Sequence, residues 1–253
     1  MRVVKKLFDF IKKELKLFRF SEKENSLTFD NGKMQVLISK KTGLIDKYCV
    51  DGVDRLNSES AKITVYRDNE DPWGMRTDNF SERIGEFTLL SAEKANAFNG
   101  YPEETLANVR VIENGEVRLK IQAIFGYADS FAVVTYTLPK NGNHVDVKIR
   151  ILSNNSSRFY KLNFDSTLDS PDFYGQTAFG TEALFTDARE NVAHRFVAID
   201  NNGTCLALFN RDVYGSHFEN SALYMSLVRG VTYCAHPIGE RPLIPMDRFT
   251  KKI

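Results

Sequence analysis

The chain lacks the features that would place it in several specialised classes of protein. Its formal net charge is only +1, so no overall field would attract nucleic acid or an anionic surface. No apolar run approaches the roughly 20 residues that a membrane-spanning helix requires. No glycine-rich loop opens a helix and no Ser/His/Asp set stands out, which disfavours nucleotide binding and acyl transfer. We therefore expect neither a nucleic-acid partner nor a membrane.

Cysteine is also scarce. The three cysteines, Cys49, Cys205 and Cys234, are far apart and odd in number, and no two have the close spacing of a metal-binding motif. Cys205 falls inside an apolar run, where we expect a buried thiol that packs like a small apolar side chain. No cleavable signal peptide is apparent. This cysteine usage predicts a reduced, cytoplasmic protein.

The composition that is present is typical of a soluble globular protein. Hydrophobic residues make up 42% of the chain and charged residues 26%, which argues against disorder. A length of 253 residues suits one large β-sandwich or two small domains, and length alone does not decide between them.

Residues 1–20 have the clearest helical pattern in the chain. Lysines fill much of one face, and apolar residues recur at helical spacing at Val4, Leu7, Phe8, Ile11, Leu15 and Phe18. Such a helix could lie on an anionic membrane or bind a partner. It could equally pack on its own domain or be the remnant of a linker. We expect residues 1–22 to be an amphipathic helix or linker remnant, and we favour packing over membrane contact.

From residue 23 onward, short apolar runs alternate with turn residues such as Asn31-Gly32 and Thr42-Gly43. Glycine suits these turns because it adopts a positive φ without steric cost. The predicted strands are residues 26–29, 34–38, 44–48, 61–66, 85–90, 108–113, 117–123, 131–138, 145–151, 196–199, 205–209 and 223–228. Strands broken by turns about every ten residues predict an antiparallel sandwich rather than βαβ units.

Three stretches interrupt this rhythm. Residues 68–81 and 166–186 are the most irregular, and residues 211–220 have the composition of a polar loop. Long loops on a β scaffold often carry function. We therefore look for binding residues in these stretches.

The C-terminal strands carry a family resemblance. The segments HRFVAID, LALFNRDVYG and LYMSLVRG, within residues 190–230, resemble the C-terminal β-domain of glycoside hydrolase family 38, the retaining α-mannosidases. Residues 29–56, 69–75, 177–185 and 236–253 are similar to further parts of the same domain, in the same order. The resemblance runs from about residue 25 to the end, and the opening hairpin is also similar to mutarotase-like sandwich domains.

This resemblance implies an all-β fold, a large antiparallel supersandwich of the galactose mutarotase type, preceded by one amphipathic helix. We expect the sandwich domain to cover residues 23–253 and to be truncated at its C-terminus. An unpaired sheet edge there would favour association with another chain, including a possible homo-oligomer.

The resemblance also implies what the chain does. In the family, the catalytic aspartates and the zinc ligands belong to domains that precede this one, and nothing here matches them. We therefore expect a non-catalytic β-domain that binds carbohydrate and supports a missing or separately encoded catalytic domain. Zinc and the hydrolysis of α-mannosides would belong to that domain.

Candidate carbohydrate contacts lie on one loop and in the tail. Asp71, Trp73 and Arg76 occupy the loop, where a tryptophan face suits the apolar face of a sugar. Trp73 could instead pack on the sheet, with Asp71 capping a turn. In the tail, His236 and Arg241 could bond sugar hydroxyls, or the arginine could make surface salt bridges.

Two alternatives from other classes stay open. The first is a free-standing carbohydrate-binding or assembly module that pairs with a catalytic chain. The second is an aldose epimerase, for which His194 with Glu190 or Glu182 is the nearest acid/base arrangement. A zinc site of His194, His217 and His236 lacks the close spacing of known motifs.

Overall fold

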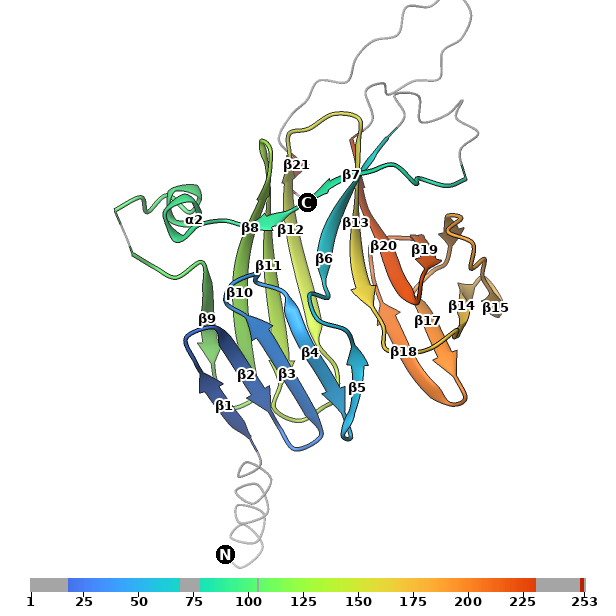
Figure 1. The fold of residues 1–253 in the computed structure, drawn as a ribbon, viewed down its shortest axis with the longest axis horizontal. Coiled ribbons are helices and arrows are strands. Elements are labelled where there is room, and N and C mark those ends of the chain that lie inside the picture. Colours follow the sequence, from blue (N-terminus) through green and yellow to red (C-terminus); the bar gives the residue numbers. More distant parts are fainter. Residues whose placement is uncertain (1–17, 69–77, 104, 231–250, 253) are drawn as a thin grey trace, which may run out of the picture. The chain divides into compact units, whose positions relative to one another are not determined.

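The computed structural model describes residues 18–68, 78–103, 105–230 and 251–252 (Figure 1). Its regular structure is nearly all antiparallel strand, and the one helix among these residues is α2 (Ala92–Phe98). The prediction of an all-β antiparallel sandwich fold is therefore confirmed. The predicted N-terminal helix lies outside the described residues and stays a prediction.

The chain divides into two compact units. Unit 1 comprises residues 1–58, 89–125 and 133–149, and unit 2 comprises residues 59–88, 126–132 and 150–253. Four strands contribute residues to both units: β8 (Thr88–Leu89), β10 (Arg118–Tyr127), β11 (Ser130–Pro139) and β12 (Asp146–Ser153). The predicted single domain over residues 23–253 stays a prediction.

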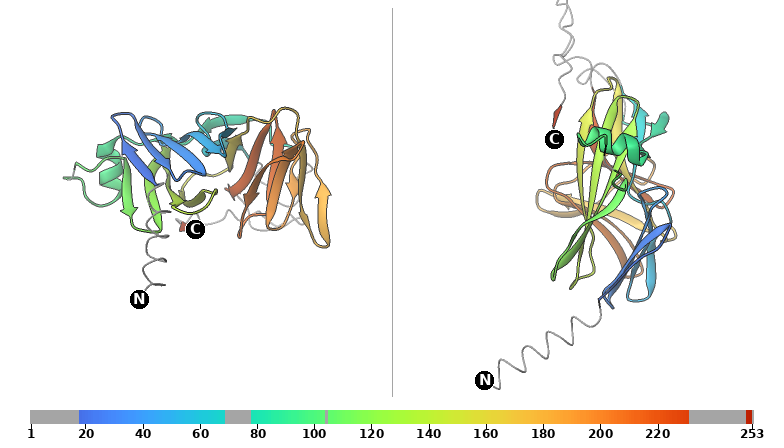
Figure 2. Two further views of the ribbon diagram at one scale, coloured as in Figure 1. Left: turned by 90° about the horizontal axis from the view of Figure 1, so that it is seen from below. Right: turned by 90° about the vertical axis from the view of Figure 1, so that its left-hand side faces the viewer.

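Unit 1 begins with a five-stranded antiparallel meander, drawn in blue in Figures 1 and 2. Its strands are β1 (Arg19–Glu22), β2 (Ser26–Asp30), β3 (Met34–Ser39), β4 (Ile45–Val50) and β5 (Val53–Leu56). In the second sheet of unit 1, β9 (Val109–Asn114) pairs with β10, and α2 follows β8 (Thr88–Leu89). The Ser91 hydroxyl caps α2 by accepting from the Lys94 N–H at 3.3 Å.

The predicted turn at Gly43 packs against strands β10 and β11 of the second sheet. Gly43 has a φ of +74°, and an added Cβ would lie 2.8 Å from Cζ of Phe125. The buried Tyr136 hydroxyl donates to the Gly43 carbonyl at 2.9 Å. A side chain at position 43 would therefore be strained by both the backbone and the packing.

Unit 2 contains a six-stranded sheet and a four-stranded sheet, both antiparallel. The six-stranded sheet has the order β16 (Asn191–Val192), β19 (Gly215–Glu219), β20 (Ala222–Arg229), β13 (Arg158–Asp165), β6 (Lys62–Arg67) and β7 (Arg83–Glu86). The four-stranded sheet has the order β15 (Gly180–Ala183), β14 (Asp172–Thr177), β17 (Phe196–Asn201) and β18 (Thr204–Phe209). The rings of Phe173 and Phe218 stack at 5.4 Å and join the two sheets. At the end of the chain, β21 (Lys251–Lys252) pairs with β12.

The structure corrects several expectations for unit 2. Residues 166–186 and 211–220 are not simply loops, since they contain β14, β15 and β19. The Cys205 thiol is exposed, and within the run 205–209 only Leu206 is buried, because β18 is an edge strand. The central strand β13 and the helix α2 were not predicted.

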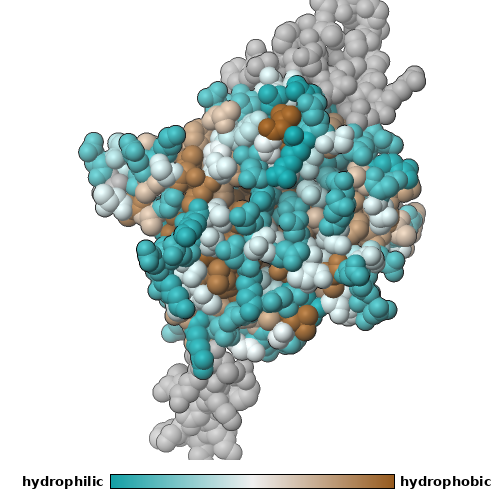
Figure 3. Space-filling model, viewed as in Figure 1, coloured by the Kyte–Doolittle hydropathy of each residue, from teal (hydrophilic) through white to brown (hydrophobic). Residues whose placement is uncertain are grey.

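The surface seen in Figure 3 is mostly hydrophilic, with hydrophobic residues scattered over it. In unit 2, large exposed apolar side chains include Phe179, Val192 and Phe209, at 104%, 72% and 78% exposure. Scattered apolar residues of this kind are common on soluble domains and do not by themselves mark a site.

Candidate functional site

One face of the six-stranded sheet carries a buried cluster of ionisable side chains. Lys161 comes from β13, His217 from β19, and Glu190 from the segment just before β16. The strand register places Lys161 between Thr64 of β6 and Ser226 of β20. We call Lys161, Glu190 and His217 the Lys161 cluster.

The Lys161 cluster is tightly bonded. The Lys161 ammonium is ion-paired with the Glu190 carboxylate, and its Nζ lies 2.7 Å from Nδ1 of His217. Nδ1 of His217 lies 3.5 Å from Oε1 of Glu190. The side chains of Lys161, His217 and Glu190 are 0%, 3% and 19% exposed, so only Glu190 reaches the surface appreciably.

Aromatic rings surround the ammonium. Nζ of Lys161 lies 4.7 Å from the ring centroid of Phe159, 5.0 Å from Tyr66 and 5.6 Å from Phe80. The imidazole of His217 stacks on Tyr224 with the centroids 4.2 Å apart. A cation held over several ring faces is stabilised by cation–π attraction, which partly offsets the cost of its burial.

Burial and pairing shift the pKa of each member. Burial lowers the pKa of Lys161, with Glu190 opposing the shift. Burial raises the pKa of Glu190, but hydrogen bonds from His217 and Lys161 outweigh it and the net pKa is lowered. Burial and the charge of Lys161 lower the pKa of His217. At neutral pH the cluster therefore holds an ionised Glu190, which is ion-paired with Lys161, beside a neutral His217.

A second buried ion pair lies beside the same face. The fully buried carboxylate of Asp68 accepts two hydrogen bonds from the Arg229 guanidinium, at 2.9 and 2.6 Å. The guanidinium carbon of Arg229 lies 5.1 Å from the Phe80 ring centroid and 5.7 Å from that of Phe159. Asp68 and Arg229 are therefore fixed relative to β13.

These contacts hold the described parts of the predicted binding stretch, residues 68–81, before and after residues 69–77. Asp68 precedes residues 69–77, and the carbonyl of Asp78, which follows them, accepts from the Glu190 N–H at 2.7 Å. Gly230, which precedes the tail, donates its N–H to Arg158 at 2.7 Å. The described ends of the loop and the start of the tail thus meet at one face of the sheet.

The predicted contact residues themselves, Asp71, Trp73, Arg76, His236 and Arg241, lie outside the described residues. Their roles stay predictions.

The structure pairs Glu190 with side chains other than His194, the histidine suggested for an epimerase. His194 is exposed in the bend before β17, and its N–H donates to the Gln176 carbonyl. The Glu190 carboxylate instead meets His217 and Lys161.

The described residues do not fit a zinc site. Within the described ranges, no group of three or more His, Cys, Asp or Glu side chains could hold a metal ion. Among the described residues, no helix is long and apolar enough to cross a membrane.

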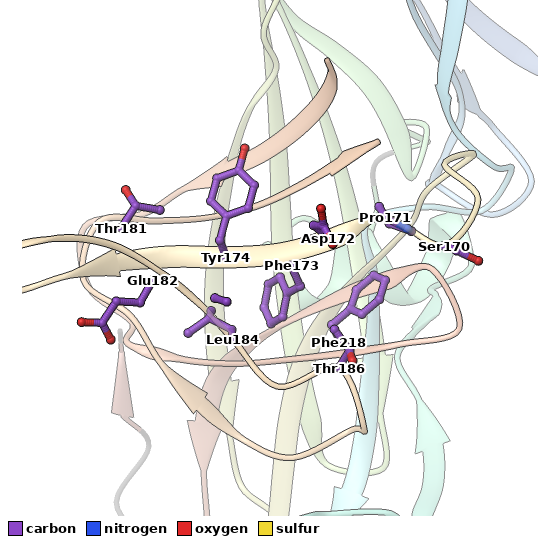
Figure 4. Close-up of a pocket in the computed structure, with 11 residues that line it drawn as sticks. Ser170, Pro171, Asp172, Phe173, Tyr174, Thr181, Glu182, Leu184, Thr186 and Phe218 are labelled. Atoms are coloured by element: carbon purple, nitrogen blue, oxygen red, sulfur yellow. The ribbon is translucent and has the colours of Figure 1, made fainter. Parts of the chain in front are cut away.

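An open pocket of about 710 Å³ lies beside β14 and β15 in unit 2 (Figure 4). It is lined by Ser170, Pro171, Asp172, Phe173, Tyr174, Thr181, Glu182, Ala183, Leu184, Thr186 and Phe218. Figure 4 shows Phe173 and Leu184 pointing to one side of β14 and Tyr174 pointing to the other. None of the lining residues carries a positive charge.

Comparison with known families decides the relationship. The model of the glycosyl hydrolases family 38 C-terminal domain matches residues 29–237, well over half of the chain. The chain belongs to this family. This match confirms the family resemblance predicted from the segment HRFVAID and the neighbouring segments.

Solved structures agree in fold. The crystal structure of an α-mannosidase from Enterococcus faecalis V583 matches with a TM-score of 0.57 and 11% identity, over 85% of this chain and 26% of that chain. A second structure, a protein in glycosyl hydrolase family 38 from Enterococcus faecalis, matches with a TM-score of 0.56, 11% identity and the same coverage. The family 38 domain thus spans about a quarter of the length of these proteins. No curated protein matches the chain.

Sequence reasoning missed the Lys161 cluster in this family 38 domain. The sequence suggests His217 only as a possible zinc ligand, and no pattern marks Lys161 as part of a site. The available signal was a lysine inside the aromatic run Phe159-Tyr160-Lys161, because a charge between large apolar residues in a strand indicates a buried, paired charge.

Proposed function

We propose that this family 38 domain is the non-catalytic β-domain of an α-mannosidase-like glycosidase. In this role it supports a catalytic domain and contributes carbohydrate contacts to the substrate site. The whole enzyme would hydrolyse α-mannosides, and the carboxylates and zinc for that reaction would belong to the catalytic domain.

One observation carries the proposal: the family 38 C-terminal domain match over residues 29–237. Because a retaining glycosidase needs two carboxylates about 5 Å apart across the scissile bond, a domain without such a pair would act through binding and support.

We assign the carbohydrate contacts to Asp71, Trp73 and Arg76 of the loop and to His236 and Arg241 of the tail. The support is twofold. The residue types suit a sugar, with one aromatic face and several charged hydrogen-bonding groups. The described residues next to both segments are also tied to one sheet face by the Asp68–Arg229 pair.

Titration of the full chain with α-linked mannose oligosaccharides tests this assignment. We expect saturable binding that Trp73→Ala weakens about tenfold or more, since loss of an aromatic platform removes a large contact. Tyr101→Ala is the matched control, because Tyr101 is a 61% exposed aromatic residue in unit 1. Equal affinity in wild type and Trp73→Ala would refute the assignment of the loop.

Support of a catalytic domain is tested by assembly. Expressed together with a family 38 catalytic domain from the same organism, the chain should co-purify with it. Independent elution of the two chains at micromolar concentration would count against this part of the proposal.

A further inference from the structure

We propose that β18, an edge strand of the four-stranded sheet, pairs with the same strand of a second copy of this chain. The proposal concerns an interaction surface of unit 2. It goes beyond the proposed function and does not depend on it.

The composition of β18 sets this strand apart from the other sheet edges. Its sequence, Thr-Cys-Leu-Ala-Leu-Phe, contains no charged residue and no proline. Among the other edge strands that the structure describes, β1, β5, β7, β9, β15 and β21 each contain at least one charged residue, and β8 and β16 are only two residues long. Charge and shortness protect a sheet edge from pairing with another strand, so β18 lacks a protection that the other edges have.

The backbone of β18 is also regular enough to accept a partner. All residues from Thr204 to Phe209 pair with β17 in an unbroken antiparallel register, and β17 is the one described strand that pairs with β18. By contrast, β5, β7 and β9 pair with their neighbours through a register shift. A bulge twists an edge away from an incoming strand, and β18 has none.

Several apolar side chains of β18 are left uncovered. The Phe209 side chain is 78% exposed, the Cys205 side chain is exposed, and Ala207 and Leu208 are half-buried. Leu206, which is buried, and Leu208 alternate with the other three and therefore lie on the inward face of the sheet. A strand added at this edge would extend the inward face and the outward face alike.

The strand is complementary to itself. In an antiparallel pair of two copies related by a two-fold axis at Ala207, this residue lies opposite its own copy. Leu206 then lies opposite Leu208 of the second copy, and Cys205 lies opposite Phe209 of the second copy. Residues directly opposite each other share a face, so the leucines would extend the core and the cysteine sulfur would meet an aromatic ring.

The distribution of charge favours a second copy as the occupant. The chain has a formal net charge of only +1, so two copies repel each other little. A symmetric pair at β18 brings no two charged side chains of these strands together. The same arrangement at β15 would bring two Glu182 carboxylates close to each other, and like charges across a strand pair are destabilising.

Sedimentation equilibrium of the full chain between about 1 and 100 µM tests the pairing. One strand pair makes a small interface, so we expect a weak equilibrium, with dimer at the high concentration and monomer at the low one. Ala207→Lys should weaken the dimer about tenfold or more, because it places two like charges directly opposite each other. Thr181→Lys is the matched control, because it adds the same charge at an exposed position on the other edge of the same sheet, and it should leave the dimer unchanged.

Hydrogen–deuterium exchange of the wild type gives a test that needs no substitution. The peptide that contains residues 204–209 should exchange more slowly at about 100 µM than at about 1 µM, because pairing protects the outer amides of β18. The peptide that contains β15 should exchange at the same rate at both concentrations. Exchange of β18 that does not depend on concentration would count against pairing with a second copy.

The other occupants of this edge are outcomes of the same experiments. A wild-type chain that stays monomeric at about 100 µM would overturn the proposal. Weaker co-purification of Ala207→Lys with a catalytic domain would then assign the edge to that domain. A dimer that neither lysine variant weakens, or that both weaken equally, would place the contact elsewhere and likewise overturn the proposal. None of these outcomes affects the carbohydrate contacts of the proposed function, which Trp73→Ala decides.

Discussion

Lys161 shows how one residue can organise a sheet face. Its ammonium is fully buried between Glu190, His217 and three aromatic rings. The position requires partners, because an unpaired charge in such surroundings is costly. Through Glu190, Lys161 also holds the segment that bonds Asp78, next to the predicted carbohydrate loop.

We expect Lys161→Met to lower the free energy of unfolding by about 3 kcal/mol, because it leaves the partly buried Glu190 without its cation. Urea denaturation measures this loss. Lys161→Met/Glu190→Gln should recover part of it, since the uncompensated charge is then removed as well. Lys148→Met, an exposed control, should change stability by no more than about 0.5 kcal/mol. A loss as small as that of the control would contradict the paired-charge interpretation.

The cluster also predicts a pH dependence. The folded-state pKa values of Glu190 and His217 are both lowered, so in acid the unfolded chain binds more protons than the folded chain. Stability should therefore fall as the pH drops below about 6.5, first through His217 and then, below about 4.5, through Glu190. Burial lowers the pKa of Lys161, so the contribution of this group to stability rises as the pH approaches 10.5.

Urea unfolding between pH 4 and 7 measures this slope. Exposed carboxylates with a lowered pKa, such as Glu113 and Asp187, act in the same direction, so the comparison with a variant is decisive. His217→Asn should flatten the curve between pH 5 and 6.5. A slope in that range equal to the wild-type slope would rule out His217 as its source.

At the scale of elements, turns and half-buried strands were predictable from the sequence and fully enclosed strands were not. Strands such as β12 were predicted because their apolar residues alternate with charged ones. β13 was missed because both its faces are buried, and Lys161, Asn163 and Asp165 interrupt its apolar residues. β19 was missed because two of its buried residues, Ser216 and His217, are polar.

The candidate site was predictable only in part, for the same reason. The sequence indicated the loop and the tail, but the Lys161 cluster joins β13, β19 and the segment before β16. These elements become neighbours through pairings that local periodicity does not reveal.

The turn at Gly43 provides a test at this scale. Gly43→Ala should destabilise the chain by more than Gly52→Ala, with an added loss of about 1–3 kcal/mol. Both glycines have a positive φ, +74° and +80°, but only the Cβ at position 43 would meet Phe125 and Leu89, at 2.8 and 2.9 Å. Thermal unfolding of the two variants measures the difference. Equal losses would show that backbone strain alone, without packing, sets the requirement for Gly43.

At the scale of the whole molecule, the chain is a family 38 C-terminal domain that spans 26% of the α-mannosidase structure it matches. The two compact units are each built from antiparallel sheets, and unit 2 contains the Lys161 cluster, the Asp68–Arg229 pair and the pocket. In the proposed function, sugar recognition and structural support belong to this chain and bond cleavage to a catalytic domain.

Incubation of the purified chain with zinc and an aryl α-mannoside, followed by measurement of the aryl alcohol released, shows whether the chain itself cleaves the glycosidic bond. We expect no release above the rate without protein, because the proposed function places the zinc and the carboxylate pair in the catalytic domain. Sustained zinc-dependent turnover that co-elutes with the chain would contradict it.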